Sequence, residues 1–67
     1  MNTATLTPRE TEVLTWIQNG KTSFEIGKIL GISENTVETY VARVRGKLNA
    51  STRSQAVAIA IASKLLS

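Results

Sequence analysis

The sequence predicts an all-α fold of four helices that contains a helix-turn-helix. Four helix-start signatures occur along the chain, apolar residues follow each one at helical spacing, and no segment has the pattern of a strand. We expect helices near residues 8–19, 23–30, 34–48 and 53–65. With 67 residues the chain makes one small domain, which we place at residues 6–67 after a flexible lead-in at residues 1–5.

The first helix is predicted from the sequence TPRE. Thr7 is a typical N-cap residue, Pro8 fits the first helical position, and Glu10 completes a capping box. Asn19-Gly20 is typical of a helix end.

The second helix is predicted from a second capping box, TSFE, in which Thr22 is the N-cap and Glu25 reaches back to it. Gly31 ends this helix within the turn LGIS. A short helix, a glycine-containing turn and a longer helix form the helix-turn-helix pattern, whose second helix lies in the DNA major groove.

The third helix begins after Ser33 as N-cap and ends at Asn49. The side chains that point away from its apolar stripe are short, mixed in character and mostly hydrogen-bonding, as the reading of base edges requires. The residues expected to contact bases are Asn35, Glu38, Thr39, Ala42 and Arg45. Those expected on the flank, against phosphates, are Thr36, Arg43 and Lys47.

Glu38 has two interpretations. Its carboxylate can accept a hydrogen bond from a cytosine amino group. Alternatively, Glu34 and Glu38 only complement the positive end of the helix dipole.

The fourth helix is predicted from Thr52 and Gln55 and continues into the sequence AVAIAIA. It is apolar all round, so one side should face a second copy of the chain or another domain. The residues expected in a weak homodimer contact are Ala58, Ile61, Ala62 and Leu65. Alternatively, Ile61 and Leu65 fold back onto the first helix near Trp16.

The remaining apolar residues at helical spacing are expected to form the core. They are Leu6, Val13, Leu14, Ile17, Ile26, Ile29, Leu30, Ile32, Val37, Val41, Val44, Leu48, Ala56, Val57 and Ala60.

Composition excludes several classes of function. The chain contains neither cysteine nor histidine, so disulfides, thiolate metal sites and the commonest general base are excluded. We expect no enzyme activity, no cofactor, no metal and no small-molecule site. Without a signal peptide or membrane span, a cytoplasmic protein is expected. Residues 39–67 carry five basic and no acidic residues, as is typical of nucleic-acid binding.

The segment LTPRETEVL…NGKTSFEIGKILGISENTVETYVARVRGKLNASTRSQAVAIA resembles the LuxR-type (NarL/FixJ-like) helix-turn-helix output domain of bacterial transcription regulators. GKTS at 20–23 and RSQAVAIAI at 53–61 are most similar to the quorum-sensing branch. The resemblance implies that the third helix reads double-stranded DNA and the fourth dimerises, on an inverted-repeat operator, with RNA polymerase as a further partner.

The resemblance also implies site residues. Positions 38, 39 and 42 usually face bases, whereas Lys21, Thr22, Ser23, Arg43 and Lys47 match positions that usually face phosphates. The chain departs from the family at four positions, where Gly27, Glu38, Tyr40 and Arg43 replace the usual alanine, basic residue, histidine and asparagine.

Two other functions stay open. A sigma-factor-like promoter-reading domain shares LTPRE and LGIS but usually ends near the third helix. A protein-interaction module without DNA binding would use Trp16, Phe24 or the fourth helix as its surface.

Overall fold

The computed structural model describes residues 5–66, and residues 1–4 of the expected lead-in lie outside them. The helices are α1 (Pro8–Gln18), α2 (Ser23–Leu30), α3 (Glu34–Leu48) and α4 (Arg53–Ala62). The all-α prediction is confirmed, and the described part of the chain contains no strand. Within it, no helix has both the length and the apolar character needed to cross a membrane.

All four predicted helix starts are confirmed by their caps. Thr7 with Glu10 and Thr22 with Glu25 form complete capping boxes. The Ser33 hydroxyl accepts the N–H of the third residue of α3, and the Thr52 hydroxyl does the same for α4. These caps satisfy N–H groups that have no acceptor within the helix.

The predicted end of the fourth helix at residue 65 is wrong, because α4 ends at Ala62. Lys64 takes a left-handed conformation with φ 61°. The N–H of Lys64 then donates to the Ile61 carbonyl over 3.0 Å, and the N–H of Leu65 donates to the Ala60 carbonyl over 2.8 Å. This pair of bonds is a Schellman motif, which closes a helix. The first helix also ends one residue before the prediction, at Gln18.

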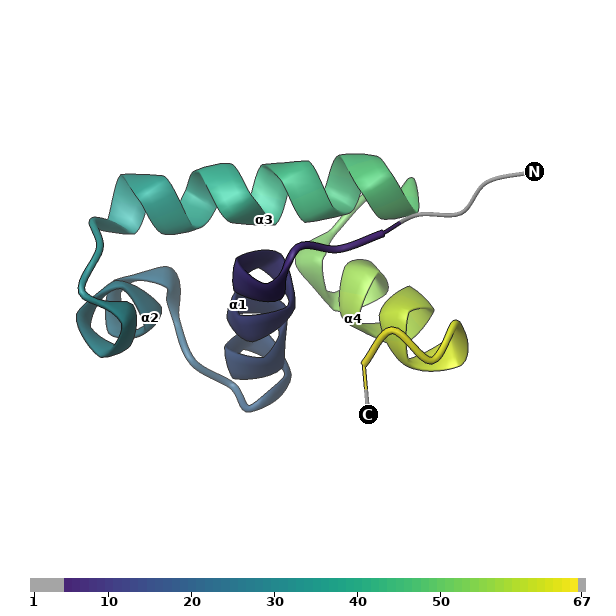
Figure 1. Cartoon of the computed structure of the whole chain (residues 1–67), viewed down its shortest axis with the longest axis horizontal. Helices are drawn as coiled ribbons and strands as arrows, with labels where there is room; N and C mark the ends of the chain where they lie inside the picture. Colours follow the sequence, from purple (N-terminus) through teal and green to yellow (C-terminus); the bar gives the residue numbers. More distant parts are fainter. Residues whose placement is uncertain (1–4, 67) are drawn as a thin grey trace.

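The long helix α3 lies across the other three helices (Figure 1), with α1 between α2 and α4. The core has two clusters of buried side chains on either side of α1. One joins α1, α3 and α4 through Leu14, Val44, Leu48, Ala56, Ala60 and Leu66. The other joins α1, α2 and α3 through Val13, Ile26, Val37 and Val41.

One core assignment is wrong, and one core residue was not predicted. Ile29, expected in the core, is 45% exposed, because α2 turns that side away from α1 and α3. Leu66, which was not predicted, is 8% exposed, since the left-handed Lys64 turns the chain back onto α1 and α3.

The helix-turn-helix is closed by a tight turn. Gly31, at φ 73°, occupies the left-handed position after α2. Gly27 lies so close to the turn that a side-chain carbon on it would sit 2.7 Å from the Ile32 carbonyl oxygen. Glycine at position 27 thus lets the turn approach α2 more closely than alanine would allow.

Candidate nucleic-acid interface

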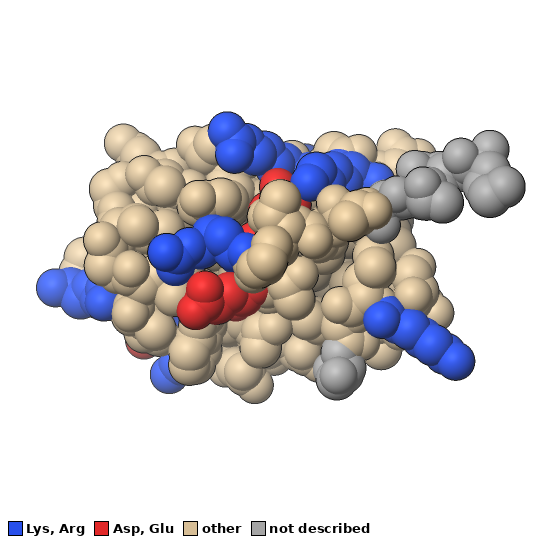
Figure 2. Space-filling view, viewed as in Figure 1, with Lys and Arg blue, Asp and Glu red and all other residues tan. Residues whose placement is uncertain are grey.

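The outward face of α3 carries exposed side chains that make little contact with the rest of the fold. Asn35, Thr39, Ala42 and Arg43 are all exposed. The Thr39 hydroxyl donates to the Asn35 carbonyl over 3.1 Å. Figure 2 shows Lys and Arg side chains along the edge formed by α3, with acidic side chains below them.

Two flank residues of α3 differ in their surroundings. Arg43 lies with its guanidinium 5.8 Å from the centre of the Tyr40 ring. Within residues 5–66 it forms no ion pair, so its charge stays unneutralised. Thr36 is exposed, and its hydroxyl lies 2.8 Å from that of Ser33.

Glu38 is engaged within the chain. It accepts a hydrogen bond from the Ser23 hydroxyl at the start of α2. Arg53, at the start of α4, donates from Nη2 to both carboxylate oxygens, over 3.2 and 3.1 Å. The bond from Ser23 and the charge and bonds of Arg53 outweigh desolvation and lower the pKa of Glu38.

Lys47 is also engaged within the chain. Its Nζ lies 2.7 Å from the carboxylate of Glu10, whose side chain is only 3% exposed. The same Nζ donates to the Thr5 carbonyl over 3.1 Å, so Lys47 attaches the described end of the lead-in to α3. Its ammonium therefore neutralises a buried carboxylate.

Arg45 turns toward the segment before α4 and away from the outward face. Its Nη2 donates to the Ser51 carbonyl over 2.7 Å. Its Nε is buried and has no partner among the described residues. The guanidinium thus holds the connection between α3 and α4.

The three predicted phosphate-contacting residues around the start of α2 differ in exposure. Lys21 and Thr22 are exposed, and the Thr22 hydroxyl caps the Glu25 N–H. Ser23 is only 5% exposed, and its hydroxyl is directed to Glu38. The N–H of Ser23 lies in the first turn of α2, where the backbone N–H groups have no acceptor within the helix.

The apolar stripe of α4 is shorter than predicted. Ala58, Ile61 and Ala62 are exposed, with Ile61 at 43%. Leu65 lies beyond the end of the helix and packs, partly buried, against the cluster around Leu14. Leu65 therefore belongs to the edge of the core and not to the expected apolar stripe.

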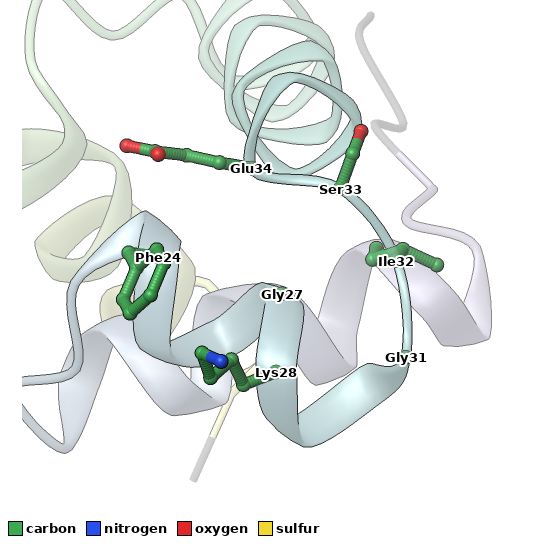
Figure 3. A pocket seen from close by; sticks show the side chains of 7 residues that line it. All are labelled: Phe24, Gly27, Lys28, Gly31, Ile32, Ser33 and Glu34. Atoms are coloured by element: carbon green, nitrogen blue, oxygen red, sulfur yellow. The ribbon is translucent and has the colours of Figure 1, made fainter.

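A shallow groove lies between α2 and the start of α3 (Figure 3). Phe24 and Lys28 line it from α2, and Glu34 lines it from α3. Phe24 is 55% exposed, with the Lys28 Nζ 5.0 Å from its ring centre. This groove contains Phe24, one of the three surfaces that a protein-interaction module was expected to use.

Arg53 belongs to the segment that carries the family resemblance, but it was not among the expected site residues. It donates to Glu38, and its Nη1 also lies 3.3 Å from the Ser23 hydroxyl. No local motif marks the contact, because Ser23 and Arg53 are 30 positions apart in the sequence.

Residues 4–60 match the model of the family described as bacterial regulatory proteins, luxR family. The chain is 48% identical over 61 residues to the transcriptional activator protein BjaR1 of Bradyrhizobium diazoefficiens, covering 91% of this chain and 25% of that protein. It is 54% identical over 63 residues to the transcriptional activator protein SolR of Ralstonia solanacearum, covering 94% and 27%. It is 52% identical over 56 residues to the quorum sensing-dependent regulator VjbR of Brucella ovis, covering 84% and 22%. The chain thus spans about a quarter of the length of these relatives.

Solved structures with the same fold include the SdiA protein of Escherichia coli. That comparison has a TM-score of 0.90 at 39% identity and covers 100% of this chain and 28% of SdiA. The VqmA–ligand–DNA complex of Vibrio cholera has a TM-score of 0.81 at 39% identity, covering 91% of this chain and 27% of VqmA.

Proposed function

This chain belongs to the luxR family of bacterial regulatory proteins, as the DNA-binding domain of a LuxR-type transcriptional regulator, and from that premise we propose that α3 lies in the major groove of double-stranded DNA. The observation that carries the proposal is the outward face of α3. Its exposed side chains are short, hydrogen-bonding or basic, and two of its neighbouring charges are already neutralised within the chain.

Base reading in this proposal rests on Asn35, Thr39 and Ala42. An asparagine amide can bond adenine, a hydroxyl can bond several base edges, and an alanine methyl can contact the thymine methyl. Glu38 and Arg45 can join them only if they leave Arg53 and Ser51.

Phosphate binding rests mainly on Arg43, whose charge is unneutralised within residues 5–66. Lys21, which is exposed, and the N–H groups of the first turn of α2, which have no acceptor within the helix, add a second contact. Thr36 is exposed in the first turn of α3 and is suited to a third phosphate contact. Lys47 contributes less than the resemblance implies, because its Nζ is held by Glu10.

We further propose that the domain acts as a weak dimer on an inverted repeat, through Ala58, Ile61 and Ala62 of α4. RNA polymerase is the proposed partner at the promoter, since several relatives are named transcriptional activators. The whole protein is proposed to respond to a quorum signal through a region outside this chain, as the name of VjbR says of that relative.

A salt titration of DNA binding tests the proposal. If each protomer of a dimer neutralises about three phosphates, the slope of log affinity against log salt should be on the order of −5. Arg43→Ala should make the slope shallower by about one per protomer and weaken binding to all sequences alike. A slope near zero would reject DNA binding and favour an interaction module centred on Phe24.

A further inference from the structure

Ser23, Glu38 and Arg53 form a polar cluster where α2, α3 and α4 approach one another. Its members come from the first residues of α2 and α4 and from the exposed side of α3. The donors are a hydroxyl and a guanidinium, and the acceptor is a carboxylate. Hydroxyls and guanidinium groups are also the donors that DNA-binding proteins direct at phosphate oxygens.

The cluster has little weight in the stability of the fold. The side chains of Arg53 and Glu38 are 39% and 47% exposed, and exposed ion pairs stabilise proteins weakly. The helices α2 and α4 do not pack against each other in the described chain, so the bond from Arg53 to Ser23 joins no core surfaces. Such a cluster needs another explanation.

We propose that Arg53 is a phosphate-binding residue for the DNA backbone, and that Glu38 is its internal competitor. The inference rests on the proposed function and adds to it a phosphate-binding residue and a carboxylate that competes with the phosphate. The Glu38 carboxylate accepts hydrogen bonds from both Arg53 and Ser23, and so uses the donors that a phosphate would need at this place. Because Ser23 is only 5% exposed, a phosphate reaches its hydroxyl only after this carboxylate moves.

Glu38 in this proposal weakens binding to every DNA sequence. Approaching DNA places a phosphate against Arg53, and the carboxylate and the phosphate repel each other. The low pKa of Glu38 keeps the carboxylate charged at neutral pH, so the competition operates under those conditions. A regulator built this way binds tightly only where base contacts add to the backbone contacts.

The test uses fluorescence anisotropy with single half-site duplexes, one carrying a site selected from random DNA and one shuffled. Glu38→Gln keeps the side-chain size and removes the charge. It should tighten binding to both duplexes about three- to tenfold and make the salt slope steeper by about 0.9. Arg53→Ala should weaken binding to both duplexes.

Glu34→Gln is the matched control, because it removes the same charge from the start of α3 without a bond to Ser23 or Arg53. It should give a smaller gain and leave the slope unchanged. In an Arg53→Ala background, Glu38→Gln should give no more than this control.

Three results would overturn the inference while leaving DNA binding in place. Glu38→Gln could weaken binding, which would make the carboxylate a support for Arg53. It could change only the preferred bases, which would make Glu38 a base reader. Circular dichroism could show that Glu38→Gln unfolds the chain, which would mean that the cluster is needed for stability. A wild-type chain that binds neither duplex would instead reject the proposed function, and the inference with it.

Discussion

At the scale of single residues, the basic side chains of α3 fall into two groups with different partners. Arg43 forms no ion pair within residues 5–66, whereas Lys47 is paired with a buried carboxylate. A periodicity argument places both on the same flank and cannot separate them. The difference depends on Glu10, which lies 37 positions from Lys47 in the sequence.

Lys47→Ala should therefore destabilise the fold by about 1–3 kcal/mol at pH 7, because it leaves a buried carboxylate without its charged partner. Urea unfolding followed by circular dichroism measures this change. Lys21→Ala is the control, since Lys21 is exposed between helices, and its effect should stay within about 0.5 kcal/mol.

The loss should also depend on pH. Burial alone would raise the pKa of Glu10, but the bond from Lys47, the bonds within the capping box and the charge of Lys47 outweigh it and lower that pKa. A carboxyl group with a lowered pKa in the folded state stabilises the fold above its unfolded pKa, about 4.3, and loses this effect as pH falls through the folded value. The difference between wild type and Lys47→Ala should thus shrink between about pH 5 and pH 3. An equal difference at pH 7 and pH 3 would show that Lys47 acts through packing alone.

At the scale of helices, the starts could be predicted from the sequence, whereas the end of α4 could not. A capping box lies within four consecutive residues, so Thr7 to Glu10 and Thr22 to Glu25 identify their helices locally. The end of α4 depends on Lys64 in a left-handed conformation, which lysine rarely adopts. That turn buries Leu66 and removes Leu65 from the predicted apolar stripe.

The shorter stripe makes Ile61 the main apolar side chain of the proposed dimer contact. Ile61→Asp should leave the fold intact, since Ile61 is 43% exposed, and should abolish cooperative binding to paired half-sites. Binding to a single half-site should persist. Gel-shift titrations on the two kinds of duplex measure this difference.

Ile29→Asp is the matched control, because Ile29 is equally exposed but lies on α2. It should keep cooperative binding to paired sites. If Ile61→Asp also kept it, the dimer surface would lie elsewhere.

At the scale of the whole molecule, α3 belongs to both core clusters, and its opposite face is left exposed. The apolar stripe of Val37, Val41, Val44 and Leu48 was predictable from its spacing, and so was the exposure of Asn35, Thr39 and Ala42. The partners of Glu38, Arg45 and Lys47 were not, because hydrogen bonds between helices leave no trace in local periodicity.

The most direct test of DNA recognition by α3 is an NMR titration of the isotope-labelled chain with a selected duplex. We expect the largest shift changes at Asn35, Thr39, Ala42 and Arg43, with smaller changes at Lys21 and Thr22. A shuffled duplex should move Lys21 and Arg43 but leave Asn35 and Thr39 nearly unchanged, because phosphate contacts do not depend on sequence. Shift changes confined to the groove around Phe24 and Lys28 or to α4, with the outward face of α3 unaffected, would contradict the account.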